Sequence, residues 1–296
     1  MSGNVSRVGT WPGATTTVVG VIGDPVAHSW SPLLHNTAFA SMGLDWVSLA
    51  FHVSRESLGD ALAGFRALGL AGLSVTMPHK TTVAAIVDER SPVAETLGAV
   101  NCVYRRGASL VGDNTDGEGF LAAVRRGVGF DPLGRRCMVV GAGGAARAVI
   151  LALAQAGAAE LVVVNRTPER AASAAALAGS TGRVGEPSEA ADMALVVDAT
   201  PSGMAGAPGS GPPLVDAALL GPGHVAVDLV YHPLATPWLE AARTRGATVM
   251  GGLGMLVHQA AAQIERWVGV GPPLEALWSA AARAAKLPPE SGTASG

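Results

Sequence analysis

The chain has 296 residues, of which 49% are hydrophobic, 15% charged and 4% aromatic, and its formal net charge at pH 7 is −3. A composition this apolar excludes a disordered chain. The small net charge gives no electrostatic reason to expect a nucleic acid or an anionic membrane as a partner. The length allows one large domain or two ordinary ones.

The sequence carries no sign of export or of a membrane span. No charged segment followed by an apolar one opens the chain, so we expect no signal peptide. The most apolar window, AVILALAQAGAAELVVV, is interrupted by Gln155, Gly157 and Glu160. Cys102 and Cys137 lack metal or redox spacing and are expected to be packed thiols. We therefore expect a soluble cytoplasmic protein.

Alternating strand and helix patterns fill the first part of the chain. Strands are predicted at 17–23, 45–53, 71–78, 99–106 and 110–116, and helices at 31–44, 54–70 and 80–89. Ser31 is the expected N-cap of the first helix, with Pro32 at its first helical position. Ser54 is expected to cap the second helix, with Ser57 as a weaker alternative. This alternation predicts an α/β domain.

A second unit begins near Gly117 and repeats the alternation. A strand, a glycine turn and a helix are predicted over 136–157, then strands at 159–167, 193–200, 224–231 and 248–252, with helices at 169–179 and 237–246. This order predicts a doubly wound parallel sheet. The Gly/Pro-rich stretch 202–214 is expected to be a mobile loop, 255–270 and 274–286 to be helical, and 287–296 to be a disordered tail.

The glycine turn GAGGAA lies between a strand and an Ala-rich helix. Gly141, Gly143 and Gly144 would let a phosphate approach backbone N–H groups and the helix N-terminus without interference from a Cβ atom. Ala145 follows in the same candidate site, and Ala146 takes the third glycine position, a substitution that the dinucleotide fingerprint allows. The alternative is a tight turn that binds no ligand.

The end of the next strand indicates which dinucleotide is bound. An acidic residue there would hold a ribose 2′-hydroxyl and repel a 2′-phosphate. Asn165, Arg166 and Thr167 instead offer an amide, a guanidinium and a hydroxyl, which suit a phosphate dianion. We therefore predict NADP(H), with Arg166 as a solvated residue at a helix start as the alternative. Arg147 is a further candidate for the phosphates or the adenine, and a surface charge is its alternative.

Polar groups also follow predicted strands of the first unit: Thr76 and Lys80, Asn101, and Asp116. Because side chains beyond strand ends converge on one crevice in open α/β sheets, we expect these groups to meet. A lysine and an aspartate facing a cofactor form a proton-transfer pair for interconverting an alcohol and a ketone. A solvated charge is the alternative for Lys80.

Other polar residues are interpreted as structural. His28 and His35 have no third ligand at suitable spacing, so no metal site is predicted. Asn114 is interpreted as a turn residue.

The chain resembles the shikimate dehydrogenase family in nine segments: HSWSPLLHN, GLSVTMPHK, GAVN, DNTDGEGF, GAGGAAR, NRT, ATPSGM, DLVYHPLATP and GLGMLVHQ. They occur in order over nearly the whole chain. The resemblance implies reversible, NADPH-dependent reduction of 3-dehydroshikimate to shikimate in the chorismate route to aromatic amino acids. It also implies an α/β fold with a discontinuous substrate domain, 1–116 plus 252–296, and an inserted Rossmann-type NADP-binding domain, 117–251.

The resemblance further implies roles for individual residues. Lys80 and Asp116 would act at the oxygen that changes between carbonyl and alcohol, and which of them is the formal base stays open. Ser29 and Ser31 would donate hydrogen bonds to the substrate carboxylate, assisted by Tyr231, although Ser31 as a helix cap alone is an alternative. The remaining assignments are Thr76, Asn101, Asp116 and Gln259 at the ring hydroxyls, Gly252 and Met255 at the nicotinamide, and Thr200 near the ribose or nicotinamide.

Two residues depart from the family pattern. Asp198 stands where asparagine is common, and Trp30, between the two serines, is bulkier than the usual neighbour. The alternatives are a quinate/shikimate or aminoshikimate dehydrogenase, with NAD preferred in the quinate case, or a non-catalytic NADP(H)-binding sensor. A sensor would be expected to have lost Lys80 or Asp116. A monomer or a homodimer is expected, with a small molecule as substrate.

Overall fold

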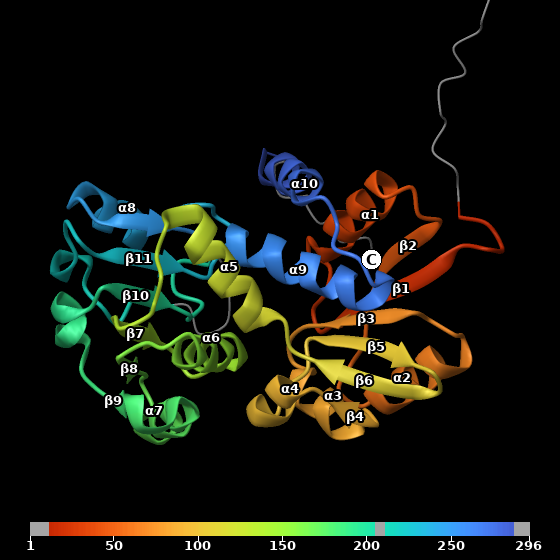
Figure 1. Cartoon of the computed structure of the whole chain (residues 1–296), viewed down its shortest axis with the longest axis horizontal. Helices are drawn as coiled ribbons and strands as arrows, with labels where there is room; N and C mark the ends of the chain where they lie inside the picture. The colour runs from red at the N-terminus through yellow and green to blue at the C-terminus, as the bar shows by residue number, and fades with distance from the viewer. Residues whose placement is uncertain (1–11, 205–210, 287–296) are drawn as a thin grey trace, which may run out of the picture.

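The computed structural model describes residues 12–204 and 211–286. The chain forms two six-stranded sheets, one built from strands within 17–113 and the other from strands within 136–250. Figure 1 shows helices α5 (Asp116–Val128) and α9 (Leu253–Val268) packed together between the two sheets. The predicted two-unit α/β fold is confirmed. Within the described ranges, no helix is both long and apolar enough to cross a membrane.

The first sheet is mixed and has the order β2-β1-β3-β5-β6-β4. Its strands are β1 (Thr17–Gly23), β2 (Trp46–His52), β3 (Gly72–Val75), β4 (Glu89–Arg90), β5 (Cys102–Arg106) and β6 (Ser109–Asp113). β1 pairs in parallel with β2 and β3, whereas β5 is antiparallel to both β3 and β6. Because β5 runs in the opposite direction, its start lies at the edge where β3 ends. Asn101, just before β5, therefore shares an edge with Thr76, just after β3.

Helices cover both faces of this sheet. They are α1 (Ser31–Ser41), α2 (Leu58–Ala67), α3 (Lys80–Ile86), α4 (Pro92–Leu97) and α10 (Leu274–Lys286). One apolar cluster joins α2 to β3 through residues such as Leu62 and Val75. On the other face, Leu34 of α1 packs in one cluster with Val257 of α9 and Leu277 of α10. The C-terminal helices therefore complete the core of the N-terminal sheet.

The second sheet is parallel throughout, with the order β12-β11-β10-β7-β8-β9. Its elements are β7 (Arg136–Val140), α6 (Gly144–Gln155), β8 (Glu160–Val164), α7 (Pro168–Ala175), η1 (Ala176–Thr181), β9 (Gly182–Val184), η2 (Pro187–Asp192), β10 (Leu195–Asp198), η3 (Ala217–Leu219), β11 (Val225–Asp228), α8 (Pro237–Thr244) and β12 (Thr248–Met250). The predicted doubly wound sheet is confirmed. The strand order reverses between β7 and β10, where such sheets bind ligands.

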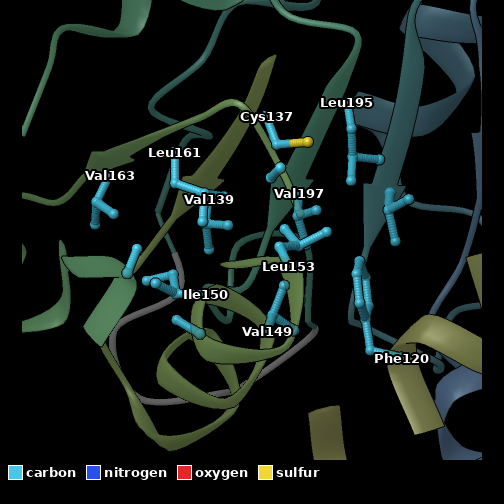
Figure 2. Close-up of a cluster of buried hydrophobic side chains, with 14 of the residues drawn as sticks. Phe120, Cys137, Val139, Val149, Ile150, Leu153, Leu161, Val163, Leu195 and Val197 are labelled. Atoms are coloured by element: carbon cyan, nitrogen blue, oxygen red, sulfur yellow. The ribbon is translucent and has the colours of Figure 1, made fainter. Parts of the chain in front are cut away.

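One of two apolar clusters in this unit lies between the sheet and α6, and the other joins the strands to α8 and η3. Figure 2 shows side chains of β7, β8 and β10 gathered with those of α6: Val139, Leu161, Val163 and Val197 with Val149, Ile150 and Leu153. Branched side chains on a parallel strand and a small-residue helix suit this close contact. The same packing fixes the start of α6 beside the glycine turn.

Two preferred helix caps are wrong, although Ser57, the weaker alternative for the second helix, is at the N-cap. α1 begins at Ser31 itself, with Trp30 at the N-cap and no side-chain cap, so Ser31 is not the cap. α2 begins at Leu58 with Ser57 at the N-cap. Ser54 does not cap it because its hydroxyl accepts the Ser57 N–H at 3.3 Å in the preceding turn. Local turn bonds of this kind compete with capping.

The predicted elements also differ from the structure in their ends and number. The strand predicted at 71–78 stops at Val75, and the one at 110–116 stops at Asp113, so Asp116 is the first residue of a helix. α4, α5, β4 and β9 were not predicted. The expected disordered tail and residues 205–210 of the expected mobile loop lie outside the described residues. We propose the domain boundaries 116/117 and 251/252, which lie at the starts of α5 and α9.

Glycine allows α5 to pack closely against α9. A Cβ atom at Gly119 would lie 2.6 Å from the backbone nitrogen of Gln259. At Gly117, a Cβ atom would lie 2.8 Å from the carbonyl oxygen of Ala148 in α6. Neither close contact could be relieved by rotating a side chain, because both neighbouring atoms belong to the backbone of a helix. α5 is therefore held between two helices at a spacing that only glycine permits.

We expect Gly119→Ala to lower the free energy of unfolding by about 1–3 kcal/mol, because the added methyl group must push α5 from α9. Gly64→Ala is the matched control, since Gly64 is inside α2 and a Cβ atom added there would meet nothing within 4 Å. This control should be neutral or stabilising by about 0.5–1 kcal/mol. Urea unfolding of both variants measures the difference, and equal effects would contradict the packing argument.

Candidate active site

Lys80 and Asp116 form an ion pair at the shared edge of the first sheet. Lys80 is the first residue of α3 and Asp116 the first of α5. The Lys80 Nζ atom donates to Asp116 Oδ2 at 2.6 Å, and the two side chains are 20% and 7% exposed. Two helix starts therefore bring together an amine and a carboxylate that are 36 residues apart in the sequence. The partial exposure of Lys80 leaves its ammonium accessible to a ligand.

Asn101 fixes the other side of the Asp116 carboxylate. The Asn101 Oδ1 atom accepts the backbone N–H of Thr115 at 2.8 Å, and a backbone N–H can only donate. The amide nitrogen of Asn101 must therefore face Asp116, where it donates to Oδ1 at 2.7 Å. Both oxygens of Asp116 thus accept from N–H donors. This arrangement fixes the orientation of the Asp116 carboxylate beside the Lys80 Nζ atom.

Helix α9 supports this arrangement from behind. The Thr115 hydroxyl donates to the carbonyl oxygen of Gln259 at 3.1 Å. Gln263, one turn further along, donates through Nε2 to the carbonyl oxygen of Asn101 at 3.0 Å. The side chain of Gln259 is nearly buried and donates to the carbonyl oxygen of Leu256 at 2.9 Å. Gln263 was missed in the sequence, although it lies on the same helix face as Gln259.

The two serines lie at the start of α1. Ser31 is buried, and its N–H donates to the Ser29 hydroxyl oxygen at 3.3 Å. The Ser31 hydroxyl makes no capping hydrogen bond to the start of α1. Thr76 is half-buried just beyond β3. Ser29 and Ser31 thus lie at the start of α1, and Thr76 directly follows β3.

Tyr231 belongs to the segment after β11 and reaches the first unit by contact with Trp30. The ring centroids of Trp30 and Tyr231 are 5.1 Å apart, at an angle of 60°. Burial raises the pKa of the Tyr231 phenol above its usual value of 10.0. The phenol therefore stays protonated at neutral pH and can donate a hydrogen bond.

A cavity of about 240 Å³ lies at the carboxyl ends of β7 and β10, where the strand order reverses. Of the predicted cofactor residues, its lining includes Gly141, Gly143, Asn165, Arg166 and Thr200. Gly141 has φ +111° and faces the backbone of Ala199, which explains the glycine there. Cβ atoms at Gly143 and Gly144 would meet nothing within 4 Å, so the space before α6 is open. Gly144 and Ala145 begin that helix.

The turn after β8 supplies the charged wall of this cavity. The Asn165 amide donates to the carbonyl oxygen of Thr167 at 3.0 Å, which shapes the turn around Arg166. Arg166 is exposed and has no ion pair among the residues that the structure describes. Arg147 instead points to α7, where it donates to the carbonyl oxygen of Ser173 at 3.4 Å. An open helix start and an available guanidinium fit a dinucleotide with an additional phosphate.

Gly252 and Met255 lie where α9 begins. The Gly252 N–H donates to the carbonyl oxygen of Val230 at 3.0 Å, and a Cβ atom there would lie 2.0 Å from the carbonyl oxygen of Leu229. Only glycine fits this contact. Met255 is buried in the apolar cluster of the nucleotide unit, together with Phe120. The structure thus joins the start of α9 to the segment that carries Tyr231.

Two buried aspartates, Asp198 and Asp228, end the adjacent strands β10 and β11 and pair in register. Asp198 accepts the N–H of Thr200 at 2.9 Å and its hydroxyl at 2.6 Å, so a carboxylate shapes this loop in place of the family's common asparagine. Asp228 accepts the Val230 N–H at 2.9 Å and the Thr236 hydroxyl at 2.7 Å. Asp228 therefore fixes the segment that presents Tyr231.

The remaining residues considered in the sequence are two histidines, one asparagine and two cysteines. His35 is buried and bonded to the Ser48 hydroxyl at 3.0 Å, and burial lowers the pKa of its imidazole to about 3. His28 is exposed. Asn114 donates to the carbonyl oxygen of Ala99 at 3.0 Å and shapes the turn before α5. Cys102 and Cys137 are both buried free thiols, as predicted, and burial raises the pKa of each thiol.

Comparison with known proteins gives consistent matches. Three family descriptions match this chain: shikimate dehydrogenase substrate binding domain over 21–103, shikimate / quinate 5-dehydrogenase over 128–198 and shikimate 5′-dehydrogenase C-terminal domain over 252–281. The shikimate dehydrogenase (NADP(+)) of Methanopyrus kandleri is 46% identical over 274 residues, covering 89% of this chain and 94% of that protein.

Two solved structures are also similar. A shikimate dehydrogenase in complex with NADP⁺ has a TM-score of 0.89 and 35% identity, covering 95% of this chain and 100% of that one. The shikimate 5-dehydrogenase of Thermus thermophilus, in complex with NADP(H) and shikimate, has a TM-score of 0.83 and 39% identity. That match covers 91% of this chain and 100% of the other.

Asp228 should make the free energy of unfolding depend on pH. Burial raises its pKa from 3.8 to about 6, so between these values the folded chain holds a proton that the unfolded chain has released. The folded state is therefore penalised as pH rises through this window. Between pH 4 and pH 7, we expect the free energy of unfolding of Asp228→Asn to rise by up to about 3 kcal/mol relative to that of the wild type.

Urea unfolding across this pH range measures the effect. Asp60→Asn is the matched control, because Asp60 is exposed on α2. A difference between Asp228→Asn and the wild type that stays constant over the range would contradict the raised pKa.

Proposed function

The chain belongs to the shikimate dehydrogenase family, and from this premise we propose that it catalyses the reversible, NADPH-dependent reduction of 3-dehydroshikimate to shikimate, in the chorismate route to aromatic amino acids. It is an NADP-dependent oxidoreductase. The observation that carries the proposal is the Lys80–Asp116–Asn101 arrangement, with donor–acceptor distances of 2.6 and 2.7 Å. It supplies a proton donor, Lys80, oriented by a carboxylate that is itself held on both sides.

Lys80 acts on the substrate oxygen. Bound NADPH supplies the hydride that reduces the ketone carbon. The Lys80 ammonium stabilises the negative charge developing on the ketone oxygen and donates its proton there. Asp116 keeps the ammonium oriented, and Asn101 keeps Asp116 oriented. In the oxidative direction, the Lys80 amine accepts the hydroxyl proton from shikimate.

The proposed substrate contacts come from both units. Ser29, Ser31 and Tyr231 bind the carboxylate through their hydroxyl groups. Thr76, Asn101, Asp116 and Gln259 bind the ring hydroxyls. A polyol held by such groups is selected strongly, because a missing hydroxyl leaves a buried polar group unpaired.

The proposed cofactor contacts surround the cavity in the nucleotide unit. Gly141, Gly143, Gly144 and Ala145 hold the diphosphate at the start of α6. Asn165, Arg166 and Thr167 hold the 2′-phosphate, and Thr200, Gly252 and Met255 lie toward the nicotinamide end. Support comes from the open space at Gly143 and Gly144 and from the available guanidinium of Arg166.

The alternatives are less well supported. A non-catalytic sensor has no need of Lys80 and Asp116, yet the two form a close, partly buried pair. An NAD-preferring quinate dehydrogenase would be expected to carry an acidic residue where Asn165 stands. Assay with shikimate, quinate and aminoshikimate and each coenzyme separates these possibilities. We further propose a cytoplasmic location and a monomer or homodimer.

Lys80→Ala should lower kcat/KM for shikimate by about 10²–10⁴-fold, because it removes the proton-transferring group. The chain contains two lysines, so Lys286→Ala, at the exposed end of α10, is the matched control and should leave kcat/KM unchanged. NADPH absorbance measures the rates. Near-native turnover by Lys80→Ala would overturn the proposed role.

Arg166→Ala should raise KM for NADP⁺ by about tenfold or more and change KM for NAD⁺ by less than about twofold, because a charged hydrogen bond to the 2′-phosphate is lost. Arg105→Ala, at an exposed site on β5 in the other unit, is the control. An equal rise for both coenzymes would show that Arg166 contacts something other than the 2′-phosphate.

A further inference from the structure

Trp30 links the two units beside the proposed carboxylate site. It lies between Ser29 and Ser31, and its indole packs edge-on against Tyr231, with centroids 5.1 Å apart. The same indole lies 6.1 Å from the ring of His232, at 62°. Both partners follow β11 in the nucleotide unit. Trp30, Tyr231 and His232 therefore form an aromatic cluster across the junction between the units.

The local structure does not explain a tryptophan at this position. Helix N-caps favour Ser, Thr, Asp, Asn and Gly, whose small side chains satisfy or expose the first backbone N–H groups. Trp30 occupies the N-cap of α1 and provides no side-chain cap. It is also only half-buried and does not belong to a core cluster. The indole packs instead against Tyr231 and His232.

The segment opposite Trp30 is anchored to its own sheet. Asp228 accepts the Val230 N–H at 2.9 Å and the Thr236 hydroxyl at 2.7 Å, on either side of Tyr231. The Gly252 N–H holds the carbonyl oxygen of Val230 at 3.0 Å. Tyr231 is therefore held by the nucleotide unit, whereas Trp30 belongs to the start of α1. Their contact requires the two units to be close together.

We infer that Trp30 is a positioning residue for the substrate carboxylate. Its indole holds the Tyr231 phenol beside Ser29 and Ser31 and joins the two units at that end of the site. This inference rests on the proposed function, in which Tyr231 and the two serines bind the carboxylate. Trp30 therefore contributes to the affinity for shikimate and leaves the proton-transfer group, Lys80, in place.

The test compares Trp30→Ala with Trp30→Phe in steady-state assays of shikimate oxidation. We expect Trp30→Ala to raise KM for shikimate by about tenfold, because two edge-to-face ring contacts are lost. Its kcat and its KM for NADP⁺ should change by less than about threefold. Trp30→Phe keeps an aromatic ring and should stay within about threefold of the wild type.

Trp278→Ala is the matched control. Trp278 is also a partly exposed indole packed edge-on against a histidine, with its centroid 6.1 Å from that of His258 at 81°. It lies on α10, outside the proposed site, so KM for shikimate should not change. If Trp30→Ala does not fold, Trp30→Leu takes its place, because it keeps apolar bulk and lacks the ring.

A double-mutant cycle tests whether Trp30 acts through its partner. In a Tyr231→Ala background, Trp30→Ala should raise KM for shikimate by less than about threefold, since the positioned phenol is already absent. A full tenfold effect in that background, an unchanged KM in Trp30→Ala, or an equal rise in KM for NADP⁺ would each overturn the inference. A wild-type protein without activity on shikimate would instead overturn the proposed function.

Discussion

The close contact between α5 and α9 determines the geometry of the active site. α5 begins with Asp116. On α9, the carbonyl oxygen of Gln259 accepts the Thr115 hydroxyl, and the side chain of Gln263 donates to the carbonyl oxygen of Asn101. The spacing of the two helices depends on Gly119, where no side chain fits. The carboxylate that orients Lys80 is therefore placed by helix packing as well as by its own hydrogen bonds.

Two buried aspartates, one in each unit, have different surroundings. Asp116 accepts two N–H donors, one of them the side-chain nitrogen of Lys80. Asp228 is more deeply buried, has the neighbouring Asp198 beside it and has no cationic partner among the described residues, so its pKa rises to about 6. Asp116 holds the side chain of Lys80, and Asp228 holds a loop. Burial is the main cause of the raised pKa of Asp228, and the neighbouring Asp198 adds to it.

The regular parts of the fold were predictable because apolar strands and the glycine turn carry local signals, and the candidate site residues were chosen because their motifs match a family. α5 was not predicted, since Gly117, Gly119 and Gly127 lower helix propensity and have their explanation only in contacts with other elements. Gln263 was missed because its partner, the Asn101 carbonyl, is remote in the sequence. The contact between Trp30 and Tyr231 likewise depends on how the units meet.

The core of the first sheet unites the two ends of the chain, and this affects the order of folding during synthesis. Val19, Leu34 and Phe39 share a cluster with Val257 and Leu277. The nucleotide unit has all its strands before the last two helices have been made. On the ribosome, its sheet can assemble before α9 and α10 are available to cover the apolar face of α1. The middle of this polypeptide is thus able to fold before its beginning.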